Sequence, residues 1–130
     1  MIGETIRPMR AAEQSVTVVI VDDHPSFRAI AQMVLETDGF AVVGTACDGE
    51  SGVAATLRLA PDVVLLDVEL PDIDGFEVAA RLRAAGSTAA IVLASSRESD
   101  DFGSLVAESG ARGFVTKADL TGDVIRALVV

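Results

Sequence analysis

Short runs of apolar, β-branched residues alternate along this chain with segments that have the apolar period of an α-helix. The alternation is typical of a parallel sheet covered on both faces, because parallel strands need a crossover connection, usually a helix, between them. The five predicted strands span residues 16–21, 41–45, 63–66, 90–94 and 113–116. The first, third and fourth are continuously apolar, which favours central positions in the sheet.

Five helices are predicted between and after these strands. The first follows Pro25 and has apolar residues at the spacing i, i+3, i+4, i+7 and i+8 of one helical face. These residues are Phe27, Ile30, Ala31, Val34 and Leu35. We expect that face to pack on the sheet. The second helix spans 50–59 and stops before Pro61, since the residue before a proline disfavours helical geometry.

The last three helices follow the same pattern with different strength. The third begins near Gly75, and its buried face is predicted to contain Val78, Ala79 and Leu82. The fourth, over 100–108, is the weakest, because Gly103 inside it costs about 1 kcal/mol relative to alanine. The fifth contributes Val124, Ile125, Leu128 and Val129. Residues 1–15 have no clear apolar period, so we expect a tail there and one domain over 16–130.

Polar side chains follow four of the predicted strands. Asp22 and Asp23 come after the first strand, Asp67 after the third, Ser95 after the fourth and Lys117 after the fifth. Because the carboxyl ends of parallel strands open onto one crevice, we expect these side chains to lie together. Crowded carboxylates repel one another unless a divalent cation lies among them, and oxygen ligands suit Mg²⁺. The pattern predicts a magnesium site that handles phosphate.

Each of these residues has a simpler explanation when taken alone. Asp22 and Asp23 could cap the following helix, Ser95 could be a turn residue, and Lys117 could be a solvated surface lysine. Asp67 is harder to explain in this way, because it ends a buried strand and would add a third carboxylate to the pair. The joint placement favours a site in which Lys117 pairs with Asp67 and then with a phosphoryl oxygen.

Composition excludes several classes of protein. Ten Lys and Arg against 20 Asp and Glu give a formal net charge of -10, so the basic surface needed for direct nucleic-acid binding is lacking. Cys47 is the only cysteine, which rules out an internal disulfide and indicates a reducing cytoplasm; we expect a buried thiol. No apolar run approaches the roughly 20 residues that span a bilayer.

Several motifs together resemble the receiver domain of two-component response regulators. They are the run Val-Ile-Val-Asp-Asp-His-Pro over 19–25, the Asp67 strand with its Leu-Pro and Asp-Gly turn, Ser95, and Phe-Val-Thr-Lys over 114–117. The start is similar to receivers of the nitrate-regulator type. The resemblance covers the chain from residue 16 onward. It implies an α/β fold with a doubly wound, flavodoxin-like sheet in the strand order 2-1-3-4-5 and five helices.

The resemblance also implies a role for each matched residue. Asp67 would accept a phosphoryl group from a phosphohistidine on a sensor histidine kinase or a histidine phosphotransfer protein. Asp23, Asp67 and the main-chain carbonyl of Glu69 would bind Mg²⁺ directly, and Asp22 mostly through water. Positioning and neutralisation of charge would supply most of the rate, with Lys117 acting on the phosphoryl oxygens.

A switch and an output surface are implied as well. Ser95 supplies the hydroxyl that moves toward the phosphoryl group, and Phe114 matches the aromatic switch position. The readout surface would be the fourth helix, fifth strand and fifth helix, which is also a candidate homodimer interface. The chain would be a cytoplasmic signalling receiver and not an enzyme acting on other substrates. No effector domain is evident in its 130 residues, so an output protein of unknown identity is expected.

Two positions depart from the match, and a third, His24, is expected to lie outside the chemistry. Ala118 follows Lys117 where many receivers have a cis proline, and a cis bond before alanine would cost about 2.5–4 kcal/mol, so we do not expect one. Leu70 stands where methionine is common, a volume-conserving exchange. His24 is expected at the surface start of the first helix and outside the chemistry, since Mg²⁺ prefers oxygen ligands.

Three other functions remain open. A phosphatase of the haloacid-dehalogenase type would also use a strand-end Asp with an acid two residues later, as Asp67 and Glu69 are spaced; but no cap segment is evident. A flavin module would need a loop rich in Ser, Thr and Gly where Asp22 and Asp23 stand. A receiver that only binds partners, without phosphorylation, is the third alternative.

Overall fold

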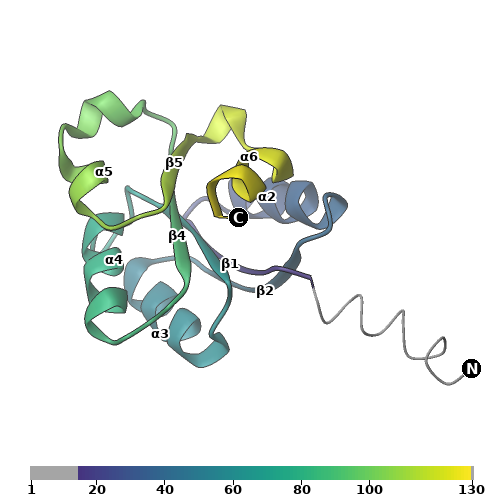
Figure 1. The fold of residues 1–130 in the computed structure, drawn as a ribbon, viewed down its shortest axis with the longest axis horizontal. Helices are drawn as coiled ribbons and strands as arrows, with labels where there is room; N and C mark the ends of the chain where they lie inside the picture. The colour runs from purple at the N-terminus through teal and green to yellow at the C-terminus, as the bar shows by residue number, and fades with distance from the viewer. Residues whose placement is uncertain (1–14, 130) are drawn as a thin grey trace, which may run out of the picture.

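The computed structural model describes residues 15–129, which form an α/β domain with a central sheet between two layers of helices (Figure 1). The strands are β1 (Thr17–Val21), β2 (Ala41–Ala46), β3 (Val63–Asp67), β4 (Ala90–Ser95) and β5 (Gly113–Thr116). The helices are α2 (Pro25–Thr37), α3 (Gly49–Leu59), α4 (Gly75–Ala84), α5 (Leu105–Glu108) and α6 (Gly122–Val129). The predicted tail over 1–15 lies outside the described residues apart from Ser15.

All five strands are parallel and lie in the order β2-β1-β3-β4-β5, so the predicted order and the central placement of β1, β3 and β4 are confirmed. Side chains alternate between the two faces, as the period of a strand requires. In β1, Val18 and Ile20 belong to one apolar core, and Val19 and Val21 belong to the other. The sheet therefore has a hydrophobic core on each face.

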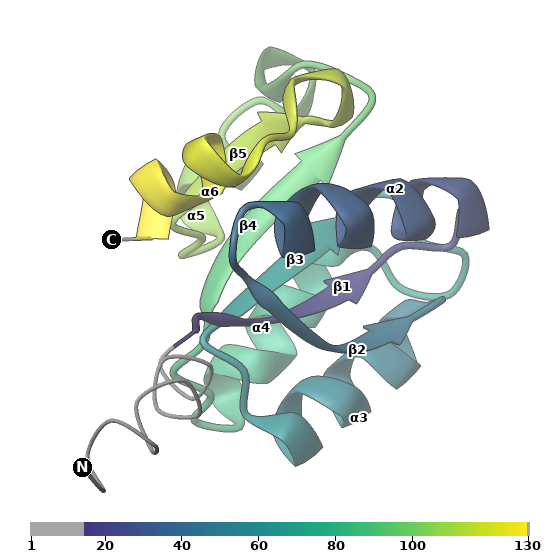
Figure 2. The same cartoon turned by 90° about the vertical axis from the view of Figure 1, so that its right-hand side faces the viewer.

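The helices divide between the two faces, as the views in Figures 1 and 2 agree. Helices α2 and α6 cover the face that contains Val18, and α3 and α4 cover the face that contains Val19. At the junction of α2 and α6, the Gly122 N–H donates to a carboxylate oxygen of Asp38 at 2.8 Å. The carboxyl ends of the five strands lie at one edge of the sheet, and the polar residues of the predicted site lie at or just after those ends.

Helix α4 begins where the chain folds back onto β3. Asp74 caps the helix by accepting the Glu77 N–H at 2.8 Å. The next residue must be glycine, because a Cβ atom at Gly75 would lie 2.5 Å from the main-chain oxygen of Asp67. The Asp-Gly pair read from the sequence therefore fixes a tight loop directly after Asp67.

Three predictions about single elements were wrong. The predicted fourth helix is broken into a 3-10 turn, η1 (Ser99–Phe102), and the four-residue α5, because Gly103 between them has φ of 59°. Ile30 is 52% exposed, since it lies about 100° around α2 from the buried Ala31 and so points beside the sheet. Cys47 is exposed rather than buried, as it follows the edge strand β2.

Within the described residues, no helix combines the length and the apolar character needed to cross a bilayer.

Candidate functional site

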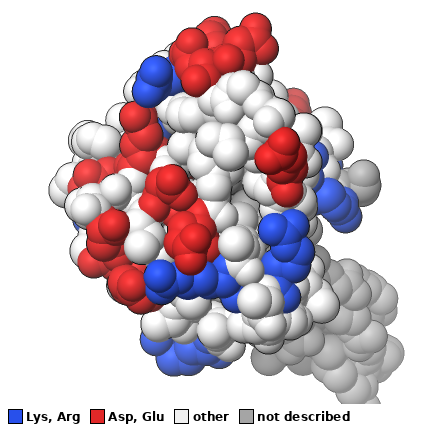
Figure 3. Space-filling view, turned by 90° about the vertical axis from the view of Figure 1, so that its left-hand side faces the viewer, with Lys and Arg blue, Asp and Glu red and all other residues white. Residues whose placement is uncertain are grey.

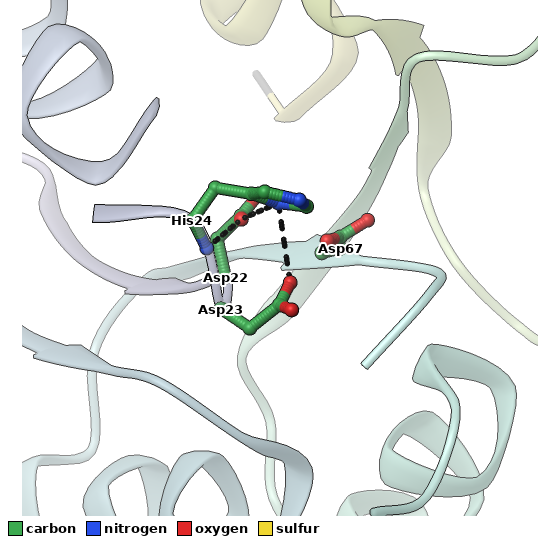
Figure 4. Close-up of side chains that lie close together, drawn as sticks. All are labelled: Asp22, Asp23, His24 and Asp67. Carbon is green, nitrogen blue, oxygen red and sulfur yellow. Dashed lines mark hydrogen bonds and ion pairs between the residues drawn. The ribbon is translucent and has the colours of Figure 1, made fainter. Parts of the chain in front are cut away.

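The turn after β1 brings two carboxylates and an imidazole together (Figure 4). Asp22 is 1% exposed, and its Oδ1 accepts the main-chain N–H of His24 at 2.8 Å. The Nδ1 atom of His24 lies 3.0 Å from Oδ1 of Asp22 and 3.2 Å from Oδ1 of Asp23. His24 itself is 63% exposed and precedes α2, so its predicted surface position is confirmed.

Asp67 faces this turn from the last position of β3 and is 3% exposed. Its Oδ1 accepts the main-chain N–H of Glu69 at 3.2 Å. The pKa of Asp67 is raised to about 6, chiefly by burial and then by the negative charge of Asp22, while Lys117 and the Glu69 N–H act in the opposite direction. An ionised Asp67 is therefore costly unless more positive charge comes near.

Among the described residues, Lys117 has the only ammonium group in contact with Asp22 and Asp67. Its Nζ atom lies 2.7 Å from Oδ2 of Asp22 and 3.3 Å from Oδ2 of Asp67. The predicted pairing with Asp67 is present, but the shorter contact is to Asp22, which the sequence did not predict. The ammonium of Lys117 also lies over the ring of Phe27 on α2, with Nζ 4.7 Å from the ring centroid. Two carboxylates and one aromatic ring therefore surround the Lys117 ammonium.

A divalent cation fits the oxygen atoms that remain. One carboxylate oxygen of Asp22, one of Asp23 and one of Asp67, with a nitrogen of His24, lie within 4.8 Å of one another. Oδ2 of Asp22 and Oδ1 of Asp23 are buried and have no hydrogen-bond partner apart from their contacts with Lys117 at 2.7 Å and His24 at 3.2 Å. Buried carboxylate oxygens with so few donors are costly, and carboxylate oxygens are the ligands that Mg²⁺ prefers. This acid cluster, Asp22, Asp23 and Asp67, is consistent with Mg²⁺.

Ser95 and Phe114 lie on neighbouring strands beside the acid cluster. Ser95 ends β4, is fully buried, and its Oγ accepts the Arg97 N–H at 3.1 Å. Phe114 on β5 is half-buried, and its ring centroid lies 6.0 Å from that of Phe102. Phe102 in turn lies 5.8 Å from Phe76 on α4. Phe114 is thus part of a row of three rings.

Glu69 and Arg97 form a contact at the mouth of the site. Nη1 of Arg97 lies 3.5 Å from Oε2 of Glu69, and both side chains are more than half exposed. The two residues have the same offset in the sequence, since each lies two positions after a strand-end residue of the site, Asp67 or Ser95. None of the described peptide bonds is cis, in agreement with the expectation for the bond between Lys117 and Ala118.

Two residues of the site were missed by sequence reasoning. Arg28 on α2 donates from Nη1 to the main-chain oxygen of Asp22 at 2.6 Å and so holds the acidic turn. Asp72, in the loop after Asp67, accepts the N–H groups of Gly49 and Glu50 at the start of α3. Neither residue had a signal in the sequence, because both act on main-chain atoms that come near only after folding.

Residues 18–128 match the model of the response regulator receiver domain family. The chain belongs to this family. Response regulator GacA of Pseudomonas viridiflava is 34% identical over 114 residues, which cover 87% of this chain and 53% of that protein. The probable transcriptional regulatory protein TcrX of Mycobacterium tuberculosis is 37% identical over 108 residues, 83% of this chain and 46% of that protein.

Solved structures show the same fold. The receiver domain of the putative response regulator NarL from Mycobacterium tuberculosis superposes with a TM-score of 0.80 at 32% identity, covering 88% of this chain and 93% of that one. The likeness to regulators of this type was predicted from the Asp-Asp-His-Pro run. The chain spans about half the length of these curated relatives.

Proposed function

We propose that this receiver accepts a phosphoryl group on Asp67 from a phosphohistidine of a sensor histidine kinase or a histidine phosphotransfer protein. The observation that supports it best is the position of Lys117, which lies between Asp22 and Asp67 in a cluster with too little positive charge. A site that already has one cation and unsatisfied carboxylates is suited to a metal ion and then to a phosphoryl group.

The transfer forms a bond between a carboxylate oxygen of Asp67 and phosphorus and breaks the phosphorus–nitrogen bond of the donor, whose imidazole leaves with the electron pair. Mg²⁺, when bound, would neutralise charge on the phosphoryl oxygens. Asp23, Asp67 and the main-chain carbonyl of Glu69 are its proposed direct ligands, and Asp22 would act mostly through water. Lys117 would move its contact from Asp67 to a phosphoryl oxygen, and Ser95 would donate its hydroxyl to another.

The proposed output is a change of the surface formed by the segment η1–α5, β5 and α6. Ser95 moving toward the phosphoryl group would leave space for the ring of Phe114, which is half-buried and in contact with Phe102. Figure 3 shows the side that carries α4 and α5, where acidic groups lie on several sides of an uncharged area and basic groups lie below it. Because acidic groups would repel the phosphates of nucleic acid, this surface suits a protein partner or a second copy of the chain better. The cytoplasmic setting stays a prediction.

A phosphotransfer assay tests the proposal. With acetyl phosphate and Mg²⁺, the intact mass should rise by one phosphoryl group, and Asp67→Asn should remain unlabelled. Labelling of Asp67→Asn to the parental extent would show that Asp67 is not the acceptor. Turnover of a generic phosphate ester would instead favour a phosphatase, and an unlabelled parental protein would favour a module that works without phosphorylation.

A further inference from the structure

The first turn of α3 receives its hydrogen-bond acceptors from two distant parts of the chain. The first amide groups of a helix have no partners within it. Asp48, the N-cap residue, accepts the Ser51 N–H at 2.8 Å. The N–H groups of Gly49 and Glu50 donate to the two carboxylate oxygens of Asp72 instead, at 2.7 and 2.8 Å. Asp72 therefore joins α3 to a loop more than 20 residues further along the chain.

That loop, residues 68–74, follows Asp67 directly and contains Glu69. Its ends are held by their own hydrogen bonds: the Glu69 N–H donates to Asp67 at 3.2 Å, and the Gly75 N–H donates to the Val68 oxygen at 2.7 Å. Its middle is held by Asp72. The main-chain carbonyl of Glu69, three residues before Asp72, lies between the held end and the held middle.

The contact between loop and helix is close and charge-assisted. A Cβ atom at Gly49 would collide with Ile73, so α3 and the loop meet with no room for a side chain. Burial alone would raise the pKa of Asp72, but the hydrogen bonds from Glu50 and Gly49 lower it to about 2. The carboxylate is ionised at neutral pH, and both bonds are of the stronger, charge-assisted kind.

We propose that Asp72 is a positioning residue for the metal site, holding the loop between Asp67 and α4 so that the Glu69 carbonyl faces the acid cluster. This inference rests on the proposed function, since it assumes that the acid cluster binds Mg²⁺. The simpler explanation is that Asp72 only caps α3. A variant of Asp48 distinguishes these two explanations. Asp48 caps the same turn of α3, and no hydrogen bond joins its side chain to the described residues of the loop.

The experiment compares Asp72→Ala with Asp48→Ala by calorimetric titration of the metal-free proteins with Mg²⁺. Calorimetry suits this chain, which has no Trp or Tyr as an intrinsic probe. Both variants lose a helix cap, and both should lower the melting temperature. Only Asp72→Ala should raise the Mg²⁺ dissociation constant, by about tenfold, the lower end of the range for residues that orient metal ligands.

Asp72→Asn is the second variant, in case alanine prevents folding. The amide keeps the shape but has one acceptor oxygen, so it can keep one of the two bonds, and we expect a smaller rise in the dissociation constant. An unchanged constant in both Asp72 variants, or an equal rise in Asp48→Ala, overturns this inference while the proposed function stands. A parental protein that takes up no Mg²⁺ overturns both.

Discussion

Asp67→Asn should stabilise the metal-free protein at neutral pH, because it removes a buried charge that the fold tolerates poorly. Asp67 is 3% exposed and close to Asp22, and its pKa is raised from 3.8 to about 6. A shift of about two units corresponds to roughly 3 kcal/mol of differential stability between the protonated and ionised forms. The variant keeps Lys117 paired with Asp22 at 2.7 Å, so no new unpaired charge is created.

The sign of the pH dependence follows from proton binding. Because the folded pKa is above the unfolded one, the native state binds more protons between about pH 4 and pH 6. The contribution of Asp67 to stability is therefore fully present at low pH and is lost as the pH rises through about 6. The advantage of Asp67→Asn over the parent should be small at about pH 4 and largest above about pH 6.5.

Scanning calorimetry in the presence of a chelator measures this difference. At neutral pH, about 3 kcal/mol corresponds to a melting temperature roughly 10 °C higher in the variant for a domain of this size. Added Mg²⁺ should shrink the gap, since it stabilises the parental carboxylates. If variant and parent have equal melting temperatures across the whole pH range without metal, burial and the charge of Asp22 do not destabilise the ionised form of Asp67.

Three further predictions concern metal, lifetime and switch. Mg²⁺ at ~100 times its dissociation constant should add about 2.7 kcal/mol to the unfolding free energy, and Asp23→Ala should lose most of this response; an unchanged titration would exclude Asp23 as a ligand. Glu69→Ala and Arg97→Ala should each dephosphorylate faster in Mg²⁺ once the phosphodonor is removed, because their ion pair at the mouth of the site would hinder the water that attacks the phosphoryl group; parental rates in both would exclude such a gate. Beryllofluoride should change amide exchange around residues 96–118 and little in α2, and a change confined to the acid cluster would exclude the switch.

The strands and the residues at their ends could be predicted because both depend on local pattern. A continuous apolar run bounded by a polar residue marks a buried strand and its end together, as at Leu66 and Asp67. The start of α4 was predictable for the same reason: Asp74 is of a residue type that favours an N-cap, and Gly75 stands where the close approach of the Asp67 carbonyl leaves no room for a Cβ atom. The site follows from topology, since parallel strands bring their carboxyl ends to one edge.

Features that depend on distant contacts could not be predicted. Arg28 and Asp72 bind main-chain atoms of segments that lie near them only in the folded chain. Lys117 lies closer to Asp22 than to Asp67, a difference between two residues that are both far from Lys117 in the sequence. The broken segment around Gly103 depends on a backbone angle that glycine permits but does not require.

Arg97 connects the mouth of the site with the row of aromatic rings, and this bears on the lifetime experiment. Besides Glu69, the guanidinium contacts Asp101 at 3.9 Å and lies 5.5 Å from the ring centroid of Phe102. An exposed ion pair alone contributes about 0–1 kcal/mol, so the ring contact is a comparable share of what Arg97→Ala removes.

The two alanine variants therefore need not behave alike. If the ion pair is the whole gate, Glu69→Ala, Arg97→Ala and the double variant should dephosphorylate at one common rate, since the second change removes nothing further. If the ring contact also matters, Arg97→Ala should be faster than Glu69→Ala and should alter exchange near Phe102. The comparison distinguishes two roles for Arg97. In one, its ion pair with Glu69 only hinders water at the site; in the other, its contact with Phe102 also couples Asp67 to the proposed partner-binding surface.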